Sequence, residues 1–157
     1  MHETLVLAMR PEWLNLILDG KKTAEVRRTR PSTLRLKACD GLDLLFYCGG
    51  QIHGCASVAH ASYFTDDYNP ETDKSDLVHM CRERHERAKL TQKAMREYLE
   101  GARRPIVYIF KAAHRFRVPL AVACRPQSWQ YADAELVEAV KEHLRAEIAA
   151  GRKEEQQ

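Results

Sequence analysis

The order of apolar and polar positions in the first thirty residues predicts a strand, a helix and a second strand. Residues 4–9 are rich in leucine and valine, as a buried strand is. Residues 11–19 open with proline and carry large apolar side chains at helical spacing, which predicts a short amphipathic helix. Gly20 is suited to a left-handed helix end, and residues 22–29 then alternate between apolar and polar side chains as a half-buried strand does.

Two later regions predict the rest of a sheet. Residues 43–48 and 51–63 are strand-like segments joined by two glycines, which predicts a hairpin with a compact turn. Gly54 lies inside the second segment and predicts a bulge or a close backbone approach, because glycine weakens a strand that lacks such a reason. Residues 106–110 and 112–122 predict the closing strands.

Helical periodicity returns twice in the second half of the chain. The stretch from about 76 to 100 predicts either one helix or two, with Ser75 or Asp76 as the first cap and Thr91 as the second. Residues 133–149 place an apolar stripe opposite charged positions, which predicts a helix packed on the sheet or on a partner. The polar residues after this helix are expected to fray.

Length and composition narrow the class of protein. A chain of 157 residues fits one domain with a real core, and 30% charged residues with a net charge of +3 do not by themselves identify a nucleic-acid binder. No apolar run approaches the ~20 residues that span a bilayer, and no leader pattern is present, so we expect a soluble, cytoplasmic protein. Five cysteines without a repeated spacing argue against a disulfide framework.

Basic residues gather around the second predicted strand. Between positions 21 and 37 there is a single acid, Glu25, and seven basic residues: Lys21, Lys22, Arg27, Arg28, Arg30, Arg35 and Lys37. Residues 82–104 add eight basic residues against four acids. Two such blocks suit an anion if folding brings them together, although a solvated edge strand explains the charges equally well.

A short pattern, GxKxxExR, directly follows the first predicted helix and consists of Gly20, Lys22, Glu25 and Arg27. It resembles the signature of the ASCH domain, a branch of the PUA-like superfamily. The similarity is reinforced by residues 5–11, by residues 96–101 and by the strand-like residues 105–110, and it covers most of residues 4–131.

The resemblance implies an α+β fold, a PUA-like five- or six-stranded β-barrel with flanking helices. The ASCH/PUA-like domain would span residues 1–131, and residues 132–157 would form a C-terminal helix and polar tail packed on the same domain. It also implies a cleft beside the signature strand that binds single-stranded RNA, or a nucleotide or modified nucleoside. No cofactor and no membrane are expected, and the oligomeric state is left open.

The resemblance also implies roles in binding for the residues of the signature strand. Lys22, Arg27 and Arg28 would engage phosphate, because lysine and arginine neutralise phosphates in complexes with nucleic acids. Glu25 would read a base or order the arginines.

Aromatic side chains supply the second half of the binding hypothesis. In the polar segment 125–131, Trp129 is expected either to stack on an unpaired base, with Gln127 reading a base edge, or to dock beneath the last helix. Trp13 and Tyr98 lie in apolar helical stripes and are expected in the core.

A second class of function is hydrolysis, as an N4-acylcytidine amidohydrolase or a ribonuclease. Lys22 and a carboxylate, Glu25 or Glu86, would perform the acid and base work. In a regular strand Lys22 and Glu25 face opposite sides, so a bend at residues 20–22 is required, and a structural ion pair is the alternative. Related PUA-like amidohydrolases that deacylate cytidine carry a catalytic threonine where this chain has Glu25, which counts against the same mechanism.

Metal chemistry has weak support in the sequence. Cysteines and histidines lie on the predicted hairpin, and Cys81 with His85 has the spacing of one helical turn. None of them forms a CxxC or HExxH pattern, so no metal site is expected.

Overall fold

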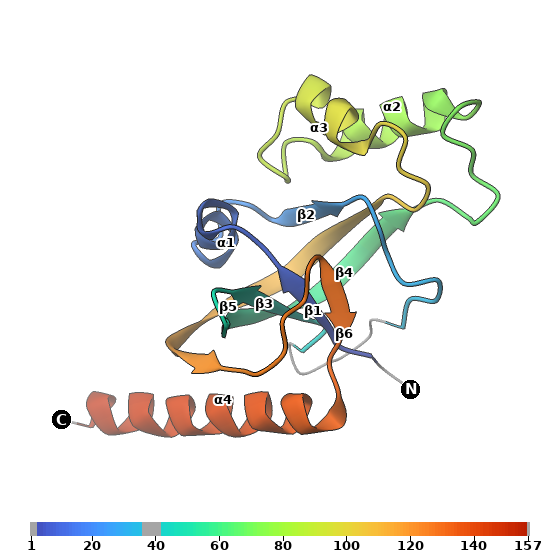
Figure 1. The fold of residues 1–157 in the computed structure, drawn as a ribbon. Coiled ribbons are helices and arrows are strands. Elements are labelled where there is room, and N and C mark those ends of the chain that lie inside the picture. The colour runs from blue at the N-terminus through green and yellow to red at the C-terminus, as the bar shows by residue number, and fades with distance from the viewer. Residues whose placement is uncertain (1–2, 36–41, 157) are drawn as a thin grey trace.

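The strands of the computed structural model, which describes residues 3–35 and 42–156, form one sheet that curls into a half-barrel (Figure 1). Its strand order is β2-β5-β4-β3-β1-β6. The strands are β1 (Leu5–Ala8), β2 (Ala24–Arg27), β3 (Leu44–Cys48), β4 (Gln51–Tyr63), β5 (Ile106–Ala121) and β6 (Trp129–Tyr131). The predicted α+β class and six-stranded barrel-like sheet are confirmed, and Lys37 of the basic cluster lies outside the described residues.

The longest ladder joins β4 to β5. β4 also pairs with β3, which forms the hairpin predicted from the two glycines. β5 is one continuous strand where two were predicted. Its pairing with β4 changes register after Ser57 and after Val58, and these shifts allow the strand to continue without a break. Gly54 makes the close approach that its sequence position predicted. A Cβ atom there would lie 2.4 Å from the backbone oxygen of His114 and 2.6 Å from a methyl carbon of Leu18.

Four helices flank the sheet in the described part of the chain: α1 (Pro11–Leu18), α2 (Lys74–Arg84), α3 (Gln92–Leu99) and α4 (Ala134–Glu155). The stretch predicted as one helix or two is therefore two. Thr91 caps α3 as expected, since its side-chain oxygen accepts the Ala94 N–H at 3.0 Å. The cap expected at Ser75 or Asp76 is wrong, because α2 begins one residue after Asp73, before either of them.

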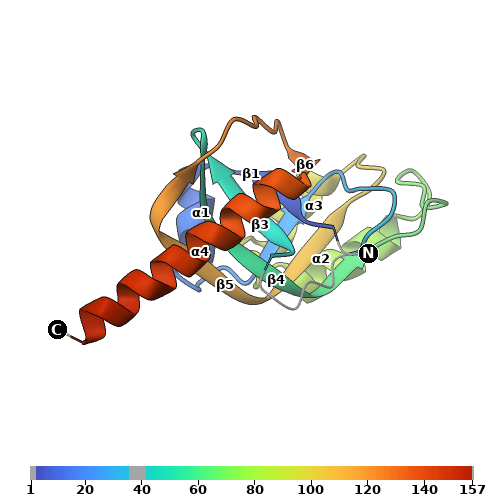
Figure 2. The same cartoon turned by 90° about the horizontal axis from the view of Figure 1, so that it is seen from below.

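The last helix is longer than predicted. Its cap, Asp133, accepts the Leu136 N–H at 2.8 Å, but the helix continues to Glu155 and does not fray after residue 149. An ion pair from Arg117 of β5 to Glu154 holds the final turns against the sheet. Figure 2 shows α4 running across the strands, with its C-terminal end extending beyond them.

Helices cover the half-barrel from opposite sides, with α2 and α3 above it and α4 below it in Figure 1. Met95 and Leu99 of α3 pack against Val26 of β2, while Val140 of α4 packs against Phe116 of β5. None of the helices in residues 3–35 and 42–156 has the length and apolar character needed to cross a bilayer.

Candidate functional site

A cleft of about 460 Å³ lies beside β2, where the start of α1, the turn before α3 and α3 itself come together. Three residues of the signature pattern line it. The lining consists of Ala8, Met9, Arg10, Trp13, Lys22, Glu25, Val26, Arg27, Leu90 and Tyr98.

The backbone between α1 and β2 turns before it extends. Gly20 adopts a φ of +78°, a left-handed value that only glycine takes at little cost. The N–H groups of Lys21 and Lys22 both donate to the Leu16 oxygen at 2.9 Å, and Ala24 donates to the Arg87 oxygen at 3.1 Å. The strand therefore begins only at Ala24, and the bend required at residues 20–22 is present.

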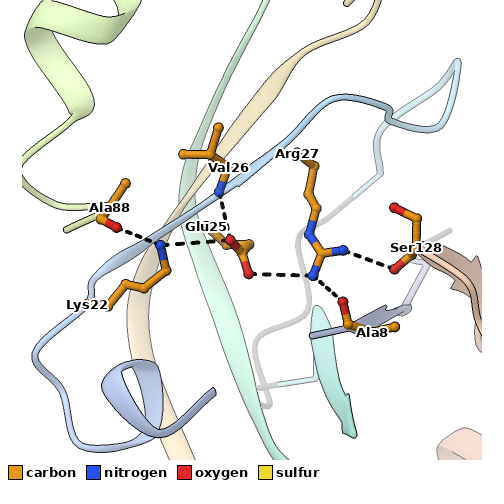
Figure 3. Close-up of polar contacts among 7 residues, drawn as sticks. All are labelled: Ala8, Lys22, Glu25, Val26, Arg27, Ala88 and Ser128. Atoms are coloured by element: carbon orange, nitrogen blue, oxygen red, sulfur yellow. Dashed lines mark hydrogen bonds and ion pairs between the residues drawn. The ribbon is translucent and has the colours of Figure 1, made fainter. Parts of the chain in front are cut away.

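This bend brings Lys22 and Glu25 together inside the cleft (Figure 3). Lys22 Nζ lies 3.8 Å from Glu25 Oε1 and donates a 2.7 Å hydrogen bond to the Ala88 oxygen. Glu25 Oε1 also accepts the N–H of Val26 at 3.0 Å. Lys22 and Glu25 are both buried, so they form a desolvated ion pair and not a surface contact.

Arg27 extends the same row of polar contacts toward the opposite edge of the sheet. Its Nη2 lies 3.5 Å from Glu25 Oε2 and donates to the Ala8 oxygen at 2.6 Å, and its Nη1 donates to the Ser128 oxygen at 3.2 Å. Arg27 thereby joins β2 to β1 and to the residue before β6 by a side chain, where no backbone ladder joins these strands. Of the five guanidinium N–H bonds, the one on Nε and one on Nη1 have no partner in the described structure.

The electrostatics of Lys22 follow from its position. Burial lowers the pKa of the Lys22 amine below its ordinary value, the nearby Glu25 carboxylate raises it, and Arg27 lowers it again. The amine also lies 4.9 Å from the centre of the Trp13 ring, close enough for a cation–π interaction. Lys22 is thus a desolvated amine held between a carboxylate and an aromatic face.

The expectation that Tyr98 belongs to the core is wrong, and Trp13 is only partly buried. Tyr98 is 44% exposed, because Met95 and Leu99 form the buried stripe of α3 and Tyr98 lies beside that stripe. Both aromatic residues line the cleft together with Leu90. Sequence reasoning missed this wall, although Trp13 stands just before the signature and Tyr98 within the ASCH-like segment 96–101.

The remaining binding candidates line no part of the cleft. Arg28 donates to the oxygens of Tyr98 at 2.6 Å and Glu100 at 3.0 Å, so it holds the end of α3. Trp129 lies in β6, a strand too short to be found from its pattern, and donates to the Thr29 hydroxyl at 3.2 Å. Gln127 is exposed.

Glu86, the other carboxylate considered for catalysis, is separated from Lys22. It is exposed and lines a second groove, on the turn between α2 and α3, of about 720 Å³. Glu25 is therefore the carboxylate that the structure places beside Lys22.

The histidines and cysteines are also candidate ligands of a metal site. Within the described ranges, no three His, Cys, Asp or Glu side chains are placed to hold a metal ion. On the hairpin, the His53 ring nitrogen Nε2 lies 3.0 Å from the Cys48 backbone oxygen and is thus engaged within the fold.

Comparisons with known proteins agree on one family. The family model of the ASCH domain matches residues 7–103. The crystal structure of ASCH from Zymomonas mobilis is similar, with 20% identity, a TM-score of 0.64, and coverage of 88% of this chain and 94% of that one. A serine-to-alanine mutant of the same protein gives 18% identity and a TM-score of 0.67, with the same coverage. The structural similarity shows a shared fold, and at this low identity it shows the fold alone. No curated protein sequence matches the chain.

Proposed function

The chain belongs to the ASCH domain family, and we propose that it binds RNA, or another nucleotide-containing ligand, in the cleft beside β2. The observation that carries this proposal is the row formed by Lys22, Glu25 and Arg27, which lies inside a cleft with aromatic side chains on its wall. Family membership supports a nucleic-acid ligand, and the geometry of the row supports the choice of this cleft.

The charges in the cleft favour an anionic ligand. Lys22 and Arg27 are buried cations, Arg10 adds a third at the rim, and Glu25 is the single acid among the lining residues. Buried basic groups interact with a phosphate more strongly than exposed ones, because less water screens the charges. In this proposal the two free N–H bonds of Arg27 are the donors available to the phosphate.

The size and the walls of the cleft favour one nucleotide unit. A volume of about 460 Å³ falls within the range of pockets that hold small ligands. Tyr98 and Trp13 offer ring faces for a base, and Glu25 offers an acceptor for an amino group on it. In contrast, Arg28, Gln127 and Trp129 would reach only a ligand that extends beyond this cleft.

Binding to a fluorescent single-stranded RNA at several salt concentrations tests the proposal. Lys22→Ala should weaken binding and lower the salt slope by about 0.7, the value for one phosphate contact on a single strand. Tyr98→Ala, at a half-exposed position, should weaken binding by about fivefold or more through lost stacking.

Lys153→Ala is the matched control, because Lys153 is an exposed lysine on α4. It should leave affinity and slope near those of the wild type. Wild-type affinity and salt slope in both the Lys22→Ala and Tyr98→Ala variants, with the fold intact by circular dichroism, would remove this cleft as the binding site.

Hydrolysis is the second candidate, favoured by the 3.8 Å separation of Lys22 Nζ and Glu25 Oε1 and by the lowered pKa of Lys22. An amidohydrolase adds water to the acyl carbon, breaks the C–N bond and returns a proton to the departing amine. Lys22 and Glu25 are the pair that would move these protons.

Intact-mass measurement of a short RNA that contains one N4-acetylcytidine distinguishes the two candidates. Loss of an acetyl mass, absent with Lys22→Ala, would establish a deacylase, and shorter fragments would establish a ribonuclease. An unchanged RNA that nevertheless binds would favour the binding protein.

A further inference from the structure

A second groove lies next to the cleft and shares one lining residue with it. Leu90 lines both the cleft and a shallow groove of about 720 Å³ on the turn between α2 and α3. The groove is formed by His85, Glu86, Lys89, Leu90, Thr91 and Gln92. Leu90 therefore lies at the boundary between the cleft and the groove.

The turn is held rigidly against the cleft. The Ala88 oxygen accepts the 2.7 Å hydrogen bond from Lys22 Nζ (Figure 3). The Arg87 oxygen accepts the N–H groups of Thr23 and Ala24. The turn also closes on itself, since Leu90 N donates to the His85 oxygen at 3.0 Å. The residue after Ala88 is therefore fixed relative to the proposed binding row.

That residue is Lys89, and its backbone conformation is unusual. Five described residues have a positive φ, and four of them are glycines, whereas Lys89 has a φ of 59°. A left-handed conformation costs a residue with a Cβ atom energy that glycine avoids. The conformation belongs to a Schellman motif, in which Leu90 N donates to the His85 oxygen and Lys89 N to the Glu86 oxygen at 3.1 Å. Glycine is the usual residue at this position, so the lysine adds a charge to the turn that glycine would lack.

Lys89 is not the only charged residue of the turn. Arg87 and Lys89 are both exposed, and they stand beside the exposed acid Glu86. This turn belongs to the second basic block, residues 82–104, and its hydrogen bonds to residues 22–24 bring it against the first block. The two basic blocks therefore meet at the junction of the cleft and the groove.

We propose that the groove on the α2–α3 turn is a second nucleotide subsite, so that the ligand is a single-stranded RNA segment of two or more nucleotides. This inference rests on the proposed function of the cleft. Lys89 contacts the phosphate that follows the nucleotide in the cleft, and the exposed amide of Gln92 is available to the next base.

Lys89→Gly separates a binding role from a structural one. Glycine removes the charge and also relieves the left-handed strain, so the melting temperature should equal or exceed that of the wild type. Fluorescence anisotropy with random-sequence, fluorescein-labelled RNAs of about two and about six nucleotides supplies the binding readout. We expect Lys89→Gly to weaken binding of the longer RNA by about tenfold and to lower its salt slope by about 0.7.

Three variants make the outcomes distinguishable. Lys22→Ala should weaken binding of both RNAs, and Lys153→Ala should change neither. Wild-type affinity and salt slope of Lys89→Gly for the longer RNA would overturn the second subsite, while a loss in Lys22→Ala in the same experiment would leave the proposed function standing. No binding by the wild type would overturn both proposals, and so would wild-type affinity in both Lys22→Ala and the Tyr98→Ala variant described above.

Discussion

Two carboxylates, Glu25 and Glu147, are buried to a similar degree on opposite sides of the half-barrel, with side chains 9% and 10% exposed. Glu25 lies in an open cleft between two basic side chains, Lys22 and Arg27. Glu147 is part of α4 and contacts β5, where its Oε1 accepts the Val118 N–H at 2.8 Å; the same oxygen lies 3.3 Å from His143 Nε2.

The two carboxylates thus have similar burial and different neighbours. Glu147 Oε2 has no hydrogen-bond partner within the described structure and lies 4.0 Å from His114 Nε2. The contacts around Glu147 hold α4 on β5, since His143 Nε2 of α4 also donates to the Val118 oxygen of β5 at 2.6 Å. Burial alone therefore does not distinguish the two carboxylates, whereas the basic neighbours and the cleft around Glu25 do.

The largest loss of stability is expected from removing the Glu25 carboxylate, which is paired with both Lys22 and Arg27. Glu25→Ala leaves Lys22 and Arg27 buried without a counter-charge, and should lower the free energy of unfolding by about 3 to 5 kcal/mol. Urea denaturation near neutral pH measures it. Glu138→Ala on the exposed face of α4 is the control and should be nearly neutral. A loss below about 1 kcal/mol for Glu25→Ala would mean that the row is not electrostatically coupled.

A smaller loss is expected on the other side of the barrel. Glu147→Ala removes the acceptor for the Val118 N–H and leaves no buried permanent charge behind, so the free energy of unfolding should fall by about 1 to 3 kcal/mol. Hydrogen exchange should show faster opening of the last turns of α4. RNA binding should persist unchanged, and a binding loss as large as that of Lys22→Ala would contradict the separation of the two regions.

Sequence reasoning reached the parts of the fold and site that local patterns determine. The hairpin of β3 and β4, the cap at Thr91 and the closeness of the signature residues in and just before β2 follow from residues near one another in the sequence. The pairing of Lys22 with Glu25 required the bend, and the bend depends partly on the Arg87 oxygen, more than sixty residues away.

Long-range packing also explains what the sequence could not predict. Tyr98 faces the cleft because other residues of α3 take the core positions, and the three-residue strand β6 exists because β1 offers it a free edge. Glu147 meets His114 only through the docking of α4 on β5. None of these contacts leaves a periodic signal in the chain.

The stability of the protein should depend on pH through Lys22, the buried amine beside Glu25 in the cleft. Because the folded-state pKa of Lys22 lies below its ordinary value of 10.5, the unfolded chain binds more protons between these two values. Within this window the free energy of unfolding of the wild type, relative to Lys22→Met, should rise with pH, by at most about 1.4 kcal/mol per unit. Urea denaturation at about pH 8 and about pH 10 measures the difference. A relative stability that falls over this interval would show that the folded state raises the pKa of Lys22.

The smallest expected effects come from two helix caps that are alike in structure and differ in location. Thr91→Ala removes the acceptor for the Ala94 N–H in α3, and Asp133→Ala removes the acceptor for the Leu136 N–H in α4. Each should lower the free energy of unfolding by about 1 kcal/mol. Only Thr91→Ala should also weaken RNA binding, by a few-fold, because α3 carries Tyr98 on the cleft wall.

The pair is informative because the loss of global stability is matched. If both variants lose similar stability and only Thr91→Ala loses affinity, the effect on binding arises in the region of the cleft and of the groove that Thr91 lines, and not from general loosening of the fold. Equal affinities in the two variants would show that the ligand does not depend on how α3 is held, and would move the binding surface away from Tyr98. A loss of affinity confined to Asp133→Ala would instead place the ligand on the side of the barrel that α4 covers.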